Sequence, residues 1–188
     1  RFFVGSSYWK SLPLNHDRYS QLFHERYDQF LNDNPIPKLL REARRFGVIT
    51  ETTDLRIRDR LNEHLYDQGP FSKVWLFGAV LDLMRHLPFI KDWSIAFEEK
   101  VFPTTFHTRE IQKTDLDVVL TPGMGGHAFY NEGMFGREAK ALGVPVFSSI
   151  TNYDNLVNMG YRGLTPRCVG VWSKMMADDA IKLQNLRA

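Results

Sequence analysis

The sequence has little cysteine, no long apolar run and only a small charge excess, and each scarcity excludes a class of protein. A single cysteine, Cys168, cannot form a disulfide within the chain. No stretch approaches the roughly 20 consecutive apolar residues of a membrane-spanning helix, and no signal peptide is visible at the start. The formal net charge of +2 is too small to predict a nucleic-acid partner. We therefore expect a cytoplasmic protein that does not bind nucleic acid.

The residues that most often hold metals are also sparse or poorly spaced. Cys168 begins the apolar run of residues 168–172, which favours a small core residue in a reducing compartment; a catalytic thiol is the alternative. The six histidines show no metal-ligand spacing with the cysteine or with one another. We expect no metal site.

The composition is that of a well-cored globular protein, with 43% hydrophobic and 24% charged residues in 188 residues, enough for one domain. The chain opens on Arg1 without an initiator Met and closes at Ala188 directly after a helical pattern. We expect a fragment of a longer protein. Lys and Arg scattered through the first half are a candidate contact with an anionic glycan or a membrane surface.

The first half reads as mostly helical, over about residues 17–102. Apolar residues recur at helical spacing in several segments, and Asn, Gly and Pro residues interrupt the pattern between them. The expected elements are a strand at 2–4, a helix at 18–31 capped by Asp17, a helix at 37–47 with Leu39 facing inward, a strand at 48–50, a helix capped by Thr53 or Asp54 that ends before Gly69, and helices at 71–87 and 93–100.

The pattern changes near residues 103–114, where we draw a soft boundary. From Asp115 onward, short apolar runs alternate with helical segments. This alternation predicts an α/β fold with a parallel sheet, because parallel neighbours need a crossover connection, usually a helix. The expected strands are 118–120, 144–150 and 169–172, and the expected helices are 131–142, a short one near Leu156, and 175–186.

Ligands of open parallel sheets bind where strands end and helices begin, and a glycine-rich turn follows the first of these strands. Gly123, Gly125 and Gly126 allow a close approach of backbone to ligand, and His127 stands at the mouth of the turn. The alternative is a turn that needs glycine for its geometry alone. The segment is neither a Walker A loop nor a Rossmann fingerprint.

A polar turn follows the second strand and is the strongest candidate site. Thr151, Asn152, Tyr153, Asp154 and Asn155 place hydroxyls, amides, a phenol and a carboxylate beside a helix N-terminus. Such groups suit a hydroxyl-rich or phosphate-bearing ligand. Asp154 is a candidate general base, or simply the N-cap of the short helix that follows.

Two further polar residues lie at strand-to-helix junctions. Ser173, after the third strand, is a candidate ligand contact or the N-cap of the last helix. Glu132, in the first turn of the helix after the glycine turn, is a candidate catalytic carboxylate or a favourable charge at the positive helix end.

Several of these motifs resemble bacterial surface-carbohydrate biosynthesis glycosyltransferases of the GT-B type. In that family a Ser-Trp-Asp-Asn-Leu-Thr-Ser-Lys-Gly segment precedes a Val-Trp-Asn strand end, and residues 151–160 and 170–176 follow the same pattern. The likeness extends to residues 117–119 and 139–145, and it is faint before about Thr105. The Asp154–Asn155 pair is kept, whereas Tyr153 replaces Trp, Asn158–Met159 replaces Ser-Lys and Ser173 replaces Asn.

The resemblance implies that residues 1–188 form a single Rossmann-like, acceptor-facing N-terminal domain, without the C-terminal domain that makes most nucleotide-sugar contacts. It implies a nucleotide-sugar donor, a glycan or lipid-linked glycan acceptor and no obligatory cofactor. Separately, the Lys and Arg of the first half lead us to expect peripheral association with the inner membrane face. The base is then Asp154, His127 or Glu132, in that order, with Gly125 and Gly126 near acceptor or diphosphate. The alternatives are a non-catalytic sugar- or nucleotide-binding domain, or a related epimerase or glycerophosphate transferase.

Overall fold

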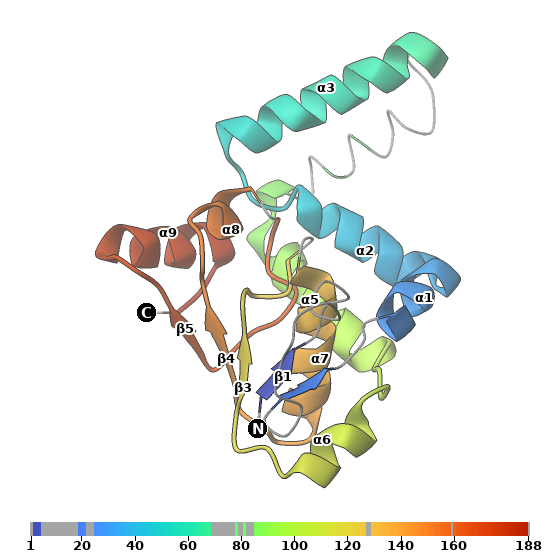
Figure 1. Cartoon of the computed structure of the whole chain (residues 1–188). Helices are drawn as coiled ribbons and strands as arrows, with labels where there is room; N and C mark the ends of the chain where they lie inside the picture. Colours follow the sequence, from blue (N-terminus) through green and yellow to red (C-terminus); the bar gives the residue numbers. More distant parts are fainter. Residues whose placement is uncertain are drawn as a thin grey trace.

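The computed structural model describes residues 2–4, 19–21, 25–68, 78, 81, 85–126, 129–158 and 160–187. The fold is α/β, with a parallel sheet in the second half and helices around it (Figure 1). Most of the helix predicted at 71–87 lies outside the described residues. The candidate base His127 also lies outside them. In the described part, no helix combines the length and the apolar character that crossing a membrane requires.

The second half follows the predicted alternation of strands and helices. Its elements are β3 (Val119–Thr121), α7 (Tyr130–Ala141), β4 (Val146–Ser149), α8 (Asp154–Val157), β5 (Cys168–Gly170) and α9 (Lys174–Gln184). The strands are parallel in the order β3-β4-β5, with Leu120 opposite Phe147 and Phe147 opposite Cys168. The predicted parallel sheet is therefore confirmed, and its strands end on one edge.

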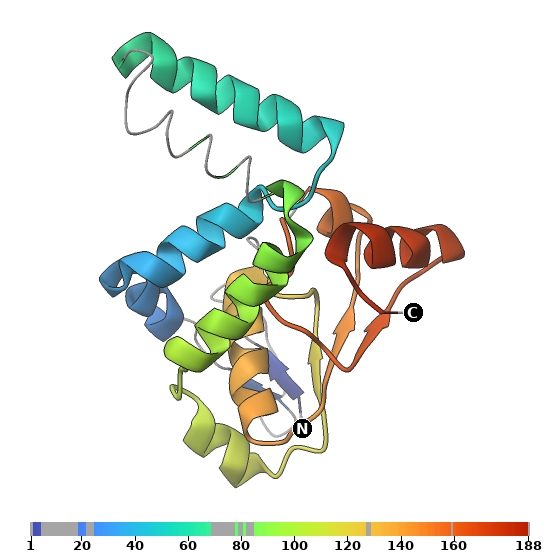
Figure 2. The same cartoon turned by 180° about the vertical axis from the view of Figure 1, so that it is seen from behind.

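One face of this sheet is covered by α7. Val119 and Val146 point to that face and pack with Met134, Phe135 and Ala139 in the main hydrophobic cluster. Figure 2, which views the molecule from behind, shows α7 beside the strands. Alternation along each strand therefore places Leu120, Phe147 and Cys168 on the opposite face.

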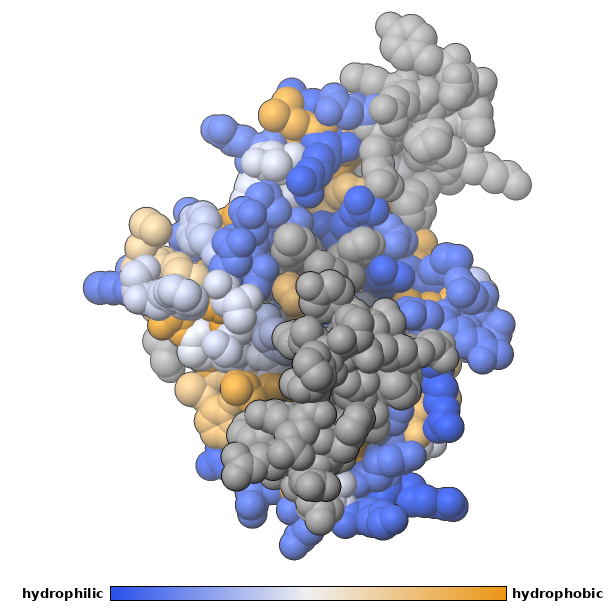
Figure 3. Space-filling view, viewed as in Figure 1, coloured by the Kyte–Doolittle hydropathy of each residue, from blue (hydrophilic) through white to orange (hydrophobic). Residues whose placement is uncertain are grey.

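The opposite face is exposed, which corrects the expectation that Cys168 is a core residue. Cys168 is exposed, and Leu120 and Trp172 keep 70% and 75% of their surface accessible. Figure 3 shows hydrophobic side chains over the lower parts of β4 and β5. An apolar run predicts a strand, but it does not show whether both faces of that strand are covered.

The first half contains β1 (Phe2–Val4), β2 (Tyr19–Gln21), α1 (Glu25–Asp33), α2 (Pro35–Arg45), α3 (Glu51–Gln68), α5 (Pro88–Val101) and α6 (Thr108–Thr114). β1 and β2 form a separate parallel pair. α2 and α5 have proline in their first turn. Proline is tolerated there because the first N–H groups of a helix have no hydrogen-bond partner within the helix. In Figure 1, α3 extends away from the rest of the molecule.

Four predictions for the first half are wrong. Residues 18–31 are not one helix, because Tyr19–Gln21 pairs with β1, a partner that local periodicity cannot show. Residues 48–50 form no strand; instead Thr53 N donates to Thr50 Oγ1 (3.2 Å), so Thr50 rather than Thr53 or Asp54 caps α3. Leu39 is 48% exposed while Leu40 is buried. In addition, α6 was not predicted from the sequence; it lies within the stretch of the soft boundary.

Candidate functional site

The predicted polar turn lies at the edge where β4 and β5 end. We call Thr151–Asn155 together with Trp172 and Ser173 the strand-end rim. Thr151–Asp154 are exposed and Asn155 is half-buried. The indole Nε1 of Trp172 donates to the carbonyl of Ile150 (2.6 Å), which joins the two strand ends. The structure therefore brings together six predicted site residues and a tryptophan that the sequence did not single out for binding.

Short polar contacts fix the shape of the turn. Asp154 N donates to Asn152 Oδ1 (3.2 Å), and Asn155 Nδ2 donates to Thr151 Oγ1 (3.1 Å). Tyr153 is the N-cap residue of α8 and Asp154 is its first residue, so Asp154 is not the N-cap that was one reading of its position. The side chains of the turn are held by one another and still face solvent.

The carboxylate of Asp154 keeps hydrogen-bonding capacity. Its Oδ1 accepts from Asn158 Nδ2 (3.2 Å), and in the described part of the chain its Oδ2 accepts no hydrogen bond. Asp154 lies in the first turn of α8, where the helix N-terminus stabilises negative charge. An ionised carboxylate in this position has the chemistry of a general base or of a hydroxyl-binding group.

Tyr153 connects the rim to α9. Its hydroxyl donates to Asp179 Oδ2 (2.8 Å), and this hydrogen bond is the main reason that the pKa of the phenol is raised. The neutral phenol is thus the form present at neutral pH. Asp179 was not identified from the sequence, and the adjacent carboxylates Asp178 and Asp179 on a helix were its only signal.

Ser173 has the predicted capping role. Its side chain accepts a hydrogen bond from Met176 N (3.2 Å) at the start of α9. The residue is nevertheless exposed beside Trp172. Capping therefore explains Ser173 structurally, while ligand contact stays a prediction.

The glycine turn is buried and held by backbone contacts. Gly125 has a φ of 66°, and a Cβ there would lie 2.7 Å from the Cα of Gly133 on α7. Gly163 N donates to Met124 O (2.8 Å), and Gly126 is buried as well. This packing supports the reading in which Gly125 is needed for geometry. Contact of Gly125 and Gly126 with acceptor or diphosphate stays a prediction.

The charged neighbour of Glu132 is Asp28 on α1, not a residue of the strand-end rim. Glu132 is half-buried in the first turn of α7, and burial is the main cause of its raised pKa, to which Asp28 on α1 contributes. The neighbouring Asn131 donates to Asp28 Oδ1 (3.0 Å). Glu132 thus faces α1, whereas Asp154 is bonded to Asn152 and Asn158.

A cavity of about 760 Å³ lies between β5 and α9; Cys168 lines it, but the strand-end rim, the described part of the glycine turn and Glu132 do not. Its walls combine apolar Val169, Ala177 and Ile181 with Arg167 and Arg187. Among the residues that the structure describes, no group of three His, Cys, Asp or Glu side chains is placed to hold a metal ion.

Comparisons with known proteins give no family assignment. No family model, no curated protein and no solved structure matches this chain.

Proposed function

We propose that this chain is the acceptor-side, Rossmann-like domain of a GT-B glycosyltransferase that moves a sugar from a nucleotide donor to a hydroxyl of a surface glycan. The observation that carries the proposal is the exposed indole of Trp172, fixed by Ile150 O beside a turn of hydroxyls and amides. Sugars have apolar C–H faces and hydroxyl edges. An aromatic ring packs on the former, and amides and hydroxyls bond the latter.

The proposed chemistry uses Asp154 as the base. Its carboxylate takes the proton of the acceptor hydroxyl while the acceptor oxygen bonds to the anomeric carbon and the bond from that carbon to the diphosphate breaks. The leaving diphosphate carries negative charge, which helix N-termini and cationic side chains stabilise. Glu132 and His127 are the second and third candidates for the base. The expected partners are a glycan or lipid-linked glycan and a C-terminal nucleotide-binding domain, with peripheral contact at the membrane.

The test is a screen of nucleotide-sugar donors with glycan acceptors, in which products are identified by mass. We expect Asp154→Ala to lower turnover by about 10²-fold or more, the usual cost of losing a general base. Asp178→Ala is the matched control, because Asp178 is also an exposed aspartate near the rim but pairs with Lys174 (3.0 Å). Glu132→Ala and His127→Ala complete the set. Retained turnover in all three folded variants contradicts the site assignment.

A second candidate is a sugar-binding domain without catalysis. It is favoured by the separation of the proposed carboxylates, since Glu132 faces Asp28 and Asp154 is bonded to asparagines. Saccharide binding measured by calorimetry separates the two functions. Binding that is lost in Trp172→Ala, with no turnover of any donor, supports the binding domain.

A further inference from the structure

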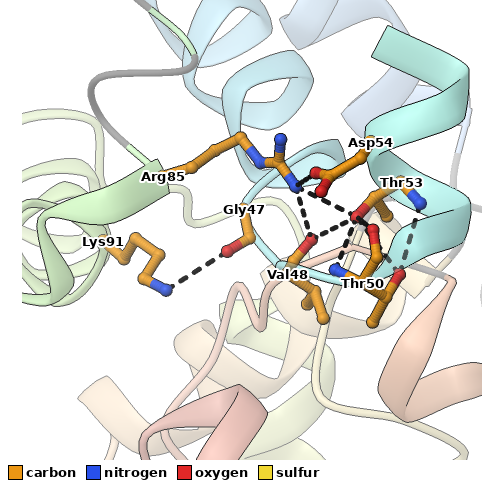
Figure 4. Close-up of polar contacts among 7 residues, drawn as sticks. All are labelled: Gly47, Val48, Thr50, Thr53, Asp54, Arg85 and Lys91. Carbon is orange, nitrogen blue, oxygen red and sulfur yellow. Dashed lines mark hydrogen bonds and ion pairs between the residues drawn. The ribbon is translucent and has the colours of Figure 1, made fainter. Parts of the chain in front are cut away.

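A small cavity of about 20 Å³ lies where the end of α2, the loop after it and the start of α5 meet. Three cations line it, namely Arg44, Arg85 and Lys91, and no acidic residue is among the described residues of its wall. Figure 4 shows Arg85, which precedes α5, and Lys91, in the first turn of α5, reaching toward the loop. The volume is that of about one oxygen-sized sphere.

The described carboxylates near this cavity balance only part of the positive charge of its described wall. Arg85 Nη2 is paired with Asp54 Oδ1 (2.6 Å). Glu98 must serve two guanidinium groups, because Arg44 Nη2 lies 2.5 Å and Arg137 Nη1 lies 3.1 Å from its oxygens. One of these two arginine charges is therefore in excess.

Lys91 adds a second uncompensated charge. Its ammonium donates to the neutral carbonyl of Gly47 (3.2 Å), lies 4.9 Å from the ring centre of Tyr161, and forms no ion pair with any described carboxylate. Lys91 also stands in the first turn of α5, where the helix N-terminus is itself positive. Burial lowers the pKa of this ammonium, and nearby Arg85 lowers it further while Asp92 opposes the change.

Arg44 and Lys91 also have N–H groups without a described hydrogen-bond acceptor. Arg44 is 3% exposed, and its Nη1 has no hydrogen-bond partner in the described part of the chain. The Lys91 ammonium has three N–H groups and uses one on Gly47. Buried charges and donors of this kind are normally matched by an acceptor of opposite charge.

We propose that this cavity, the Lys91 site, binds a phosphate group, with one phosphate oxygen in the cavity beside Lys91 and Arg44 and the rest in its open mouth. A tetrahedral oxyanion supplies both the acceptor and the negative charge that this wall lacks. The site stands apart from the rim residues, so it does not rest on the transferase proposal. The phosphate group belongs to a free ion or to a nucleotide.

The test is calorimetric titration of the whole chain with inorganic phosphate and, separately, with UDP, at constant ionic strength set by sodium chloride. Lys91→Gln is expected to weaken binding by at least about tenfold, because a charge-assisted hydrogen bond is lost. Lys91→Arg should keep most of the affinity. Lys140→Gln is the matched control, since Lys140 is an exposed lysine paired with Glu99 (3.1 Å).

The relative affinity of the two ligands identifies the source of the phosphate group. Tight binding of phosphate alone assigns the site to a free ion, and tighter binding of UDP assigns it to a nucleotide. No binding of either ligand, or equal affinity in Lys91→Gln and the wild type, overturns the proposal. Amide chemical-shift mapping of the wild type with phosphate checks the place independently of any variant, and shifts that miss Gly47 and Ser94 also overturn it.

Discussion

Glu98 is the residue on which the buried polar contacts between α2, α5 and α7 depend. Its fully buried carboxylate accepts from Tyr130 (2.6 Å) and pairs with Arg44 and Arg137. Burial alone would raise the pKa of Glu98, but the two guanidinium groups outweigh it, and the pKa is lowered. The carboxylate is thus held ionised in the folded protein.

We expect Glu98→Gln to cost about 3–5 kcal/mol in the free energy of unfolding, because it leaves buried guanidinium charge uncompensated. Urea denaturation measures this loss. The adjacent Glu99→Gln is the control, because Glu99 makes a surface pair with Lys140, for which about 0–1 kcal/mol is typical. Equal losses in the two variants would show that the buried cluster contributes no more than a surface pair.

Glu132 is a carboxylate whose removal should stabilise the protein, by an amount that depends on pH. Its folded-state pKa is raised, chiefly by burial, so ionising it costs stability as the pH rises from below its unfolded pKa of about 4.3 through the folded value. Glu132→Gln should therefore be more stable than the wild type at pH 7, by on the order of 1 kcal/mol. The gain should vanish near pH 3, where both states are protonated. Thermal denaturation at the two pH values measures it.

The exposed Glu110 in the first turn of α6 provides the control for this experiment. Glu110→Gln should give no gain at pH 7, because an exposed carboxylate at a helix N-terminus is favoured when ionised. If Glu110→Gln stabilised the protein at pH 7 as much as Glu132→Gln does, burial of Glu132 would not be the cause of the gain.

At the scale of elements, the glycine turn depends on backbone packed against backbone. A Cβ on Gly163 would collide with the carbonyl oxygen of Gly125, and neither group is the end of a flexible side chain. We expect Gly163→Ala to destabilise the protein by about 1–3 kcal/mol, as overpacking does. Gly170→Ala on β5 is the control, because its Cβ would meet only Ser148 O at 3.8 Å. Similar unfolding midpoints for the two variants would contradict the packing argument.

The elements also show what the sequence could predict. From Val119 onward each strand and helix was located to within about two residues, because periodicity and turn residues are local signals. β2 was missed because its partner β1 is distant in sequence. At the site, the polar turn was found from its composition, whereas Asp179 and the exposure of Trp172 depend on tertiary contacts between α9, β4 and β5.

At the scale of the whole molecule, single carboxylates join the helix-rich first half to the second half of the chain. Asp92 on α5 accepts from the Tyr161 hydroxyl (2.7 Å) and pairs with Arg162. Glu138 on α7 accepts from the Tyr27 hydroxyl (2.9 Å) on α1 and from two backbone N–H groups before α6. Together with Glu98, these contacts connect α1, α2 and α5 to the second half.

Because these contacts are buried or partly buried and shared, the two halves should unfold as one cooperative unit. Native-state hydrogen exchange over a urea series should show amides of α5, α7 and β4 losing protection with the same free energy. Asp92→Asn should lower that common value in all three elements. Exchange from α5 at a clearly lower free energy than from β4 would instead mean that the first half opens independently, and that these carboxylates do not couple it to the sheet.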